Sequence, residues 1–528
     1  MEVNETKIDK SQWIQFYALM FGAFVAIEAM VFQAPAIPAI ALYFEIPTHL
    51  SGFIVLSFYI MSASLYPITG RLADQYGRRK VLLVGMVIFT ASEVAAALSP
   101  TFSFLLAARA LQGVAVACIF PIVIAYIGVI FPPEKRGTAS GIFNTFQACA
   151  SMSGAAIAGI LISKYGWPII YWVSGGLGAI GFIVIFLFVK ESKGEGKGAL
   201  DLPGIILVFI ATASLLSVST LVETFGIDSL YTIATIGIGI IAAVTLWFVQ
   251  KRTTNPLLEL GLLKNRLYAL VAAIYLLNVA AMQLYIYSMN FFLTLRPGGE
   301  VTESGFFFMF IYGAAAIGGL IAGKLCDKYN NKIILLVILV IPTIALFINS
   351  QIDSTTSFST IAGIAAFFGI GSAIPVLIKL ALTVIPAPKY GAGSALLAFI
   401  RDFGAPLGSV TGIVLFSSFN QSFTQTSLMN QAEEAGVSPN LMDSVEKAGN
   451  SGGEIISNAL ADELQSLGIK FNDLMLVATE DGATLSIQNL SLVTAGFFIV
   501  LILLSIFIPK KMTEAKPKTD STSDTNAS

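Results

Sequence analysis

Apolar runs of about 20 residues, the length of helix that crosses a bilayer, recur along almost the whole chain. Only the N-terminus, the segment 419–487 and the C-terminal tail are long polar stretches. Charged residues make up 12% of the chain, whereas a soluble domain carries roughly 25%. So little charge cannot cover a water-exposed surface, so the sequence predicts an all-α polytopic membrane protein and not a soluble enzyme.

Fourteen transmembrane helices are predicted from these runs. Their expected ranges are 13–43, 50–69, 80–99, 102–131, 137–163, 168–189, 201–222, 229–250, 267–293, 303–323, 333–350, 357–385, 389–418 and 488–509. Lys and Arg collect in cytoplasmic segments of membrane proteins. With a cytoplasmic N-terminus, 23 of the 30 Lys and Arg residues are cytoplasmic and only 4 are outside. We therefore expect a multi-pass protein of the cell inner (plasma) membrane, with the N- and C-termini cytoplasmic.

The chain contains an internal repeat. The segment 70–77 (GRLADQYG) matches 323–330 (GKLCDKYN) at an offset of 253, and the spans after Gly137 and Gly391 match at an offset of 254. Two matches at nearly one offset predict two parallel six-helix bundles of the major-facilitator type, separated by two inserted helices. The expected divisions are an N-terminal bundle (1–200), an insert and linker (201–266), five helices of the second bundle (267–418), an extracellular acidic loop (419–487), and the last helix and tail (488–528).

The repeated loop motif has glycines and an acid at fixed positions. Gly77 can adopt a left-handed backbone conformation, and basic residues beside it can bind anionic lipid headgroups. Any basic cytoplasmic loop carries such charge, but the recurrence of the Gly and Asp positions in two copies of the motif favours a functional role. We expect the motif to act in conformational change; its residues are Gly70, Asp74, Gly77, Arg78, Gly323 and Asp327.

Several motifs resemble a known family. The segment 70–80 (GRLADQYGRRK) resembles the signature loop of the major facilitator superfamily, and 106–113 (LAARALQG) resembles its helix-4 motif. Three stretches are similar to the fourteen-helix drug:proton antiporters: 201–204 (DLPG), 255–266 (NPLLELGLLKNR) and 399–404 (FIRDFG). The resemblance implies proton-coupled export. The helix-5 stretch 154–159 (GAAIAG) departs from the antiporter pattern, which favours uptake as the alternative.

Six ionisable residues lie within the predicted spans: Glu28, Glu93, Arg109, Lys379, Arg401 and Asp402. A charge near the bilayer centre costs at least about 2.5–3.5 kcal/mol, so such residues usually face the bundle interior or water. We expect Glu28 and Asp402 to be the proton-coupling pair, with Glu93 in reserve. The alternative for each acid is a structural ion pair with Arg109 or Arg401. The resemblance implies a proton-transfer role for Arg109, and helix pinning is the alternative.

Aromatic and amide residues within the spans are candidates for the wall of a substrate cavity, although packing and lipid contact are the common roles of such residues. They are Phe32, Tyr59, Tyr126, Tyr275, Tyr285, Tyr287, Asn278 and Asn290.

The polar segment 419–487 contains ten acids and only two lysines. Apolar residues from Ile455 to Leu467 follow a helical spacing, so a short amphipathic helix is expected there. The segment is either a passive linker or an acidic surface that attracts cations on the outside.

The remaining composition excludes several classes of protein. His49 is the only histidine, and none of the three cysteines falls in a predicted extracellular loop. No metal site, cofactor, nucleotide-binding motif or nucleic-acid partner is expected. We expect a monomeric secondary active transporter whose partners are protons, membrane lipids and a small-molecule substrate. Proton-coupled export of amphipathic or cationic molecules is favoured. An uptake symporter or facilitator for an organic acid and a non-transporting membrane sensor are the alternatives.

Overall fold

The computed structural model describes residues 9–131, 133–192, 201–253, 260–296, 298–385, 390–450 and 456–509, and these are helical nearly throughout, with no strand among them. The first half of the chain forms α1 (Lys10–Val31), α2 (Gln33–Tyr43), α3 (Gly52–Tyr76), α4 (Arg78–Ala97), α5 (Phe102–Ile130), α6 (Pro133–Tyr165) and α7 (Pro168–Phe188). Two further helices follow, α8 (Leu202–Phe225) and α9 (Leu230–Arg252), over the range predicted as an insert.

The second half of the chain is also helical. It comprises α10 (Arg266–Leu295), α11 (Val301–Lys328), α12 (Asn331–Asn349), α13 (Phe358–Ile370), α14 (Ile374–Thr383), α15 (Tyr390–Glu434), α16 (Met442–Asn450), α17 (Asn458–Ser466) and α18 (Phe471–Ile506). Among the described residues, twelve helices are long and apolar enough to cross a membrane. Shorter apolar stretches in α6 and α8, Cys149–Tyr165 and Leu202–Val218, fall below that length.

Two of the predicted continuous spans are interrupted. The first, 13–43, divides into α1 and α2 at Phe32. Pro35 has no N–H to donate to the carbonyl of Val31 one turn earlier, so one backbone hydrogen bond of the helix is missing there. The second, 357–385, divides into α13 and α14 at residues 371–373. The sequence patterns that predicted these spans report hydrophobicity and do not detect such local breaks.

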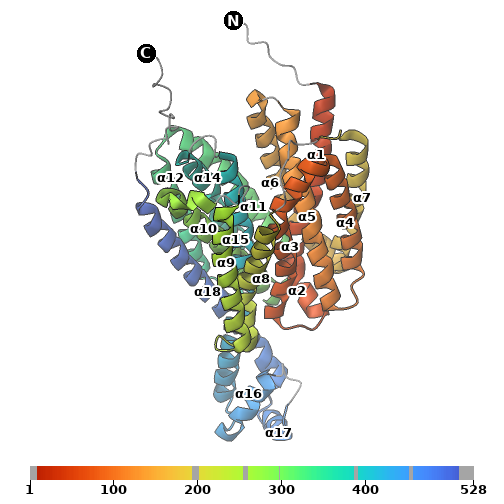
Figure 1. The fold of residues 1–528 in the computed structure, drawn as a ribbon. Helices are drawn as coiled ribbons and strands as arrows, with labels where there is room; N and C mark the ends of the chain where they lie inside the picture. Colours follow the sequence, from red (N-terminus) through yellow and green to blue (C-terminus); the bar gives the residue numbers. More distant parts are fainter. Residues whose placement is uncertain are drawn as a thin grey trace, which may run out of the picture.

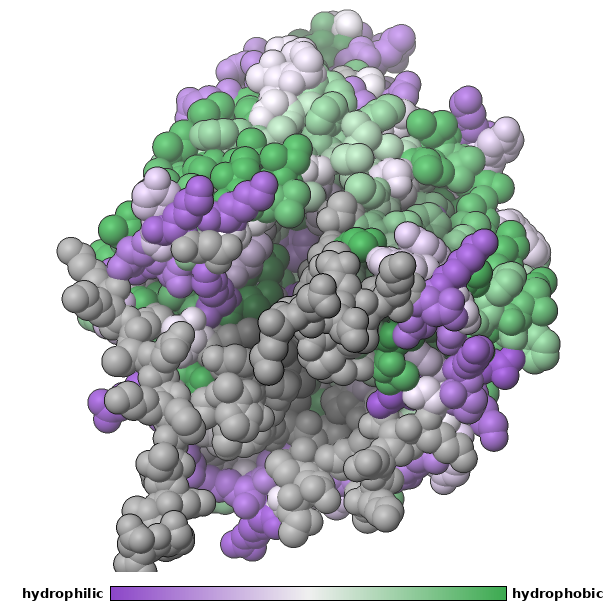
Figure 2. All heavy atoms as spheres, turned by 90° about the horizontal axis from the view of Figure 1, so that it is seen from above, coloured by the Kyte–Doolittle hydropathy of each residue, from purple (hydrophilic) through white to green (hydrophobic). Residues whose placement is uncertain are grey.

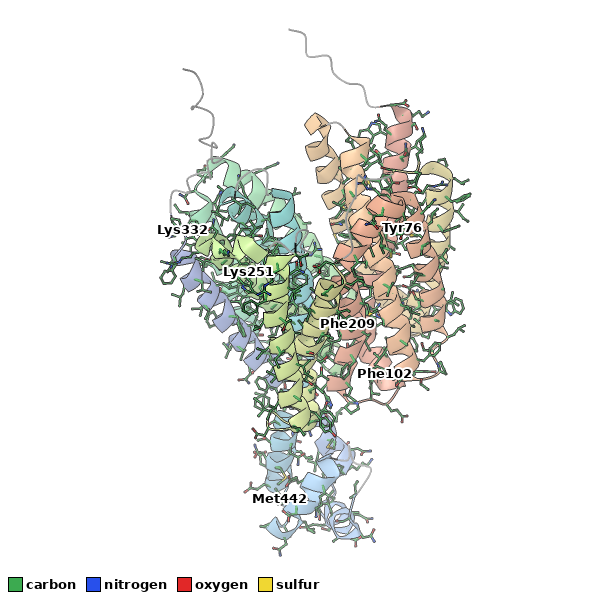
Figure 3. The ribbon with its side chains drawn as sticks, in the orientation of Figure 1. Tyr76, Phe102, Phe209, Lys251, Lys332 and Met442 are labelled. Atoms are coloured by element: carbon green, nitrogen blue, oxygen red, sulfur yellow. The ribbon has the colours of Figure 1, made fainter. Side chains whose placement is uncertain are left out.

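The two halves stand side by side and spread apart at one end (Figure 1). Helix α1 begins and α18 ends at this end. Tyr76, which ends α3, and Lys332, at the start of α12, both lie towards it, whereas Phe102 lies towards the other end (Figure 3). The two signature loops therefore share one side, as a parallel repeat requires. Helix α8 of the insert packs against α3 of the first half and α15 of the second.

The segment 419–487 is largely helical. Helix α15 runs on to Glu434 and α18 begins at Phe471, so both extend well past the predicted span ends, and α16 and α17 lie between them. These helices project from the end of the molecule opposite the start of α1, and Met442 marks their far part (Figures 1 and 3). We call residues 419–487 the acidic subdomain. The predicted amphipathic helix corresponds to α17, whose Leu460 and Leu464 are buried in a small core with Leu428.

Candidate functional site

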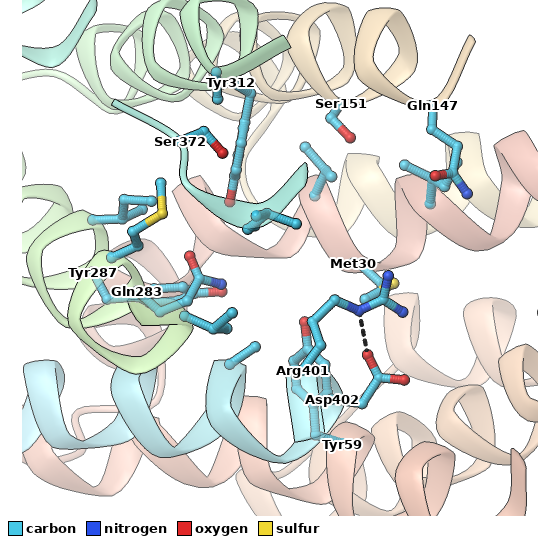
Figure 4. Close-up of a pocket in the computed structure, with 18 of the residues that line it drawn as sticks. Met30, Tyr59, Gln147, Ser151, Gln283, Tyr287, Tyr312, Ser372, Arg401 and Asp402 are labelled. Atoms are coloured by element: carbon cyan, nitrogen blue, oxygen red, sulfur yellow. Dashed lines mark hydrogen bonds and ion pairs between the residues drawn. The ribbon is translucent and has the colours of Figure 1, made fainter. Parts of the chain in front are cut away.

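A cavity of about 350 Å³ lies between the two halves. Its wall is mostly apolar, and both halves contribute polar side chains. These polar residues are Tyr59, Tyr66, Gln147 and Ser151 from α3 and α6, and Gln283, Tyr287, Tyr312, Ser372, Arg401 and Asp402 from the second half (Figure 4). Tyr59 and Tyr287 were among the aromatic residues predicted to line a cavity. The wall therefore combines aromatic rings with a few groups that can donate or accept hydrogen bonds, as small-molecule sites do.

The surface is hollowed between the halves at the end where α1 begins (Figure 2). Hydrophilic residues gather on this face, and hydrophobic residues cover the flanks (Figure 2). Large exposed hydrophobic side chains of the structure include Leu187, Ile241 and Leu320, each at least 60% exposed. Side chains of this kind are stable on an outer surface that faces lipid.

Arg401 and Asp402 form an ion pair in the cavity wall. The Nε of Arg401 donates to Oδ1 of Asp402 at 2.8 Å (Figure 4). Consecutive helical residues leave the axis about 100° apart, and the long arginine side chain folds back to close this angle. The side chain of Arg401 is 39% exposed, whereas that of Asp402 is 4% exposed. The pair thus presents its guanidinium more openly than its carboxylate.

The second carboxylate oxygen of Asp402 has no hydrogen-bond partner among the described residues. The same is true of Oε2 of Glu28 and Oε1 of Glu93, although both side chains are buried. Glu93 is close enough to Glu28 and to Arg109 for their charges to interact. The structure therefore brings Glu28, Glu93 and Arg109 together inside the first half, and Arg401 and Asp402 together in the second half. Of these five, only Arg401 and Asp402 line the cavity described above.

Arg109 connects three helices of the first half. Its guanidinium donates to the carbonyl oxygens of Ala29 at 3.3 Å and Ile54 at 3.4 Å, and to the side chain of Gln112. These residues belong to α1, the start of α3 and α5. The bonds are made to backbone and amide oxygens, which are structural partners. They support the helix-pinning interpretation of Arg109.

Several polar residues of the cavity were missed by the sequence analysis. Gln147, Ser151, Gln283, Tyr312 and Ser372 all contribute to the wall. A glutamine within an apolar span is a detectable signal, because its amide needs a polar surrounding. Ser372 lies in the interruption between α13 and α14, which hydropathy alone does not reveal.

The signature loop between α3 and α4 is attached to the end of α7. Gly77 has a φ of +112°, and a Cβ there would lie 2.8 Å from the carboxylate carbon of Glu191. The backbone N–H of Arg79 donates to that carboxylate at 3.0 Å, and the N–H of Arg78 donates to the carbonyl of Ser192 at 2.9 Å. The positive φ therefore favours glycine at position 77, whereas the nearby Glu191 carboxylate ends a flexible side chain and could move aside.

The two copies of the loop motif each contain one acid, Asp74 and Asp327. The side chains of Asp74 and Asp327 lie outside the described residues. Gly70 and Gly323 are described, and a Cβ added to either would meet no atom within 4 Å. Among the described residues, no three His, Cys, Asp or Glu side chains are grouped so that they could hold a metal ion.

These features define a multi-pass helical membrane protein of the transporter type, with a polar cavity between two halves. The family model of the Major Facilitator Superfamily matches residues 19–409. The chain belongs to the major facilitator superfamily. Membership of this family indicates a transporter.

Relatives of this chain include proteins named for drug resistance. Multidrug resistance protein 3 of Bacillus subtilis (strain 168) is 24% identical over 397 residues, covering 74% of this chain and 78% of the relative. Multidrug resistance protein Stp of Mycobacterium tuberculosis (strain CDC 1551 / Oshkosh) is 24% identical over 413 residues, covering 77% of this chain and 76% of the relative. The riboflavin transporter RibZ of Clostridioides difficile (strain 630) is also 24% identical, and the match covers 80% of this chain and 90% of the relative.

Solved structures share the fold at low sequence identity. An inward-facing, unoccupied bacterial homolog of the human lysosomal transporter Spinster has a TM-score of 0.64 at 15% identity, covering 94% of this chain and 98% of that one. The xylose transporter XylE from E. coli has a TM-score of 0.55 at 11% identity, covering 96% and 100%.

Proposed function

We propose that the protein exports amphipathic or cationic small molecules in exchange for protons, by alternating access of one cavity to the two sides of the membrane. The observation that carries the proposal is the cavity of about 350 Å³ between the two halves. Its tyrosine rings offer faces on which apolar groups and cations can rest. Its carboxylate, Asp402, is paired with Arg401 through Oδ1 and keeps Oδ2 without a hydrogen-bond partner among the described residues. The names of two relatives, both multidrug resistance proteins, support this choice.

The proposed topology has fourteen membrane helices. Helix α8 has 24 residues and α6 has 33, so each is long enough for a hydrocarbon core of about 30 Å at 1.5 Å per residue. Adding these two to the twelve apolar helices gives the predicted number, with 1–200 and 267–528 as the two halves and 201–266 as the insert and linker. We place both termini in the cytoplasm and the acidic subdomain outside, on a monomer in the plasma membrane.

The proposed proton sites are Glu28 and Asp402, with Glu93 as the reserve. Each has one carboxyl oxygen without a hydrogen-bond partner in the described part of the chain, so each has a free position at which a proton can bind. A cation in the cavity and a proton would compete for Asp402, which couples their movements in opposite directions. Glu28 lies in α1, one residue from the lining residue Ile27, so a movement of α1 would change its access to the cavity.

The proposal is tested by transport into inside-out vesicles with and without an imposed pH gradient, using a panel of cations and anions. Accumulation of amphipathic cations that requires the gradient is the expected result. Accumulation of no cation under either condition would refute the export proposal.

A second candidate function is transport of an organic acid. Two observations favour it: Arg401 is the more exposed member of its ion pair, and Ser372 and Ile374, at the start of α14, line the same cavity. The N-terminus of a helix carries a partial positive charge. Movement of a carboxylate from the anion panel across the vesicle membrane in either direction, without cation transport, would favour this function over the first.

A further inference from the structure

The two halves meet backbone to backbone at the end away from the start of α1. Gly159 of α6 and Gly305 of α11 are so close that a Cβ on Gly159 would lie 2.9 Å from the Cα of Gly305. Such an approach is open only to residues without a side chain. The cavity is therefore closed on this side by a contact between helices of opposite halves.

A hydrogen bond crosses between the halves at the same end. The side-chain Nδ2 of Asn290, on α10, donates to the carbonyl oxygen of Ala34, on α2, at 2.8 Å. Within α2 this carbonyl would normally accept from the N–H four residues later. That residue is Pro38, which has no N–H. The proline thus leaves the Ala34 carbonyl without a donor in the first half, and the Asn290 side chain of the second half donates to it instead.

The asparagine is itself held in position within its own half. Its Oδ1 accepts a hydrogen bond from the hydroxyl of Ser304, on α11. Asn290 and Ser304 are both fully buried, so no bulk water reaches their side chains in this conformation. Separation of the halves here leaves the Ala34 carbonyl and the Asn290 amide without partners until water enters, which is unfavourable for buried polar groups.

We propose that Asn290 is a positioning residue that holds this end of the transporter closed, like a latch. It does so by its hydrogen bond to the Ala34 carbonyl, which Pro38 leaves without a donor within α2. The latch favours the conformation in which the cavity opens only towards the end where α1 begins. The inference rests on the proposed alternating access, but it does not depend on which substrate or coupling ion is used.

The test measures opening at the latched end directly. Spin labels are placed at Lys164→Cys and Glu300→Cys, two exposed positions at the ends of α6 and α11, in a chain without its native cysteines. The distance distribution is recorded in lipid nanodiscs without substrate. Asn290→Ala should raise the ratio of open to closed conformations roughly two- to tenfold, the range expected for one net hydrogen bond.

A second variant tests the role of Pro38 in leaving the Ala34 carbonyl free to accept from Asn290. Pro38→Ala restores an N–H that can bond Ala34 within α2, so it should also raise the open population while Asn290 remains in place. It keeps the proposal testable even if Asn290→Ala fails to fold.

The matched control is Asn349→Ala. Asn349 is equally buried, but its partners, Tyr285 and Ser491, belong to its own half. This change should leave the label distances unaltered.

Unchanged label distances in both Asn290→Ala and Pro38→Ala would overturn the latch, as would an equal shift in Asn349→Ala. Because this readout contains no substrate, a failure of the export proposal in vesicles leaves the result interpretable.

Discussion

The guanidinium carbon of Arg109 lies 4.6 Å from the centroid of the Phe58 ring. The ring covers one face of the guanidinium, and the hydrogen bonds to Ala29, Ile54 and Gln112 use its edge. Planar stacking and a fixed fork of donors are properties that lysine lacks. A charge at position 109 is therefore not sufficient for these contacts, and the shape of the side chain is needed too.

We expect Arg109→Lys to destabilise the first half although the charge is kept. Hydrogen bonds to a charged group contribute about 1.5–3 kcal/mol each, so the loss of one or two should lower the thermal unfolding midpoint of the purified protein by several degrees. Arg252→Lys, at the exposed end of α9, is the control and should be neutral. An unchanged unfolding midpoint in Arg109→Lys would show that the guanidinium hydrogen bonds of Arg109 are not needed for stability.

Glu28→Gln and Asp402→Asn should separate proton coupling from substrate movement. Each variant should lose accumulation against a gradient and largely keep downhill exchange, because the amide cannot release a proton. The control is Glu303→Gln, whose carboxylate is paired with Arg296 at 2.6 Å and has no proposed coupling role. If both variants still accumulate substrate, Glu93 becomes the candidate to test.

The acidic subdomain should be accessible from outside the cell. Cysteine at the exposed position Glu446 should react with an impermeant thiol reagent on intact cells, in a background in which the exposed Cys149 is replaced. Cysteine at Tyr329, which is 65% exposed near the other end, should react only after the cells are opened. The reverse pattern would invert the proposed orientation.

Substitutions in the signature loop should affect turnover more than binding. Asp74→Asn and Glu191→Ala should slow transport severalfold with little change in substrate affinity, because the loop lies at the end of α3, about 15 Å along the helix from the cavity residue Tyr66. Glu191 is included because its carboxylate accepts the N–H of Arg79. Parallel measurements of binding and of transport rate provide the check, and a large loss of affinity at normal turnover would contradict the prediction.

Neutralising the acidic subdomain should weaken cation transport through its electric field. Replacement of five exposed acids by amides, at Glu433, Glu434, Glu446, Asp462 and Asp473, should raise the KM for a cation a few fold at low ionic strength. The effect should fade in salt of about 0.15 M or more, where charges beyond roughly 8 Å are screened. A salt-independent change would indicate a structural cause, and no change would favour a passive linker.

The all-helical, multi-pass character could be predicted from the sequence because hydrophobic length is a strong local signal, whereas the number of fourteen helices stays a prediction. The repeated motifs at Gly70 and Gly323 also predicted the parallel halves, since one offset relates two long stretches. The breaks near Phe32 and Ser372 could not be located in this way. They arise from missing hydrogen bonds and from packing, which leave the hydrophobic pattern unchanged.

The site was only partly predictable from the sequence. An acid or an arginine within an apolar span is conspicuous, so Glu28, Arg109, Arg401 and Asp402 could be singled out. Which of them reach a common cavity depends on how two bundles 250 residues apart in the chain face each other, and no local pattern records this. The partnership of Asn290 with Ala34 is of the same kind, because its donor and acceptor come from different halves.

Helix α15 extends from the cavity residues Arg401 and Asp402 to Glu434 in the acidic subdomain, with Pro406 inside it near the cavity. At 1.5 Å per residue, about 48 Å of helix separates Asp402 from that tip. A tilt of this whole helix by about 10° displaces the tip by roughly 8 Å, so small rotations are magnified there. A fluorophore on the acidic subdomain would thus report movements of the second half without any label near the cavity.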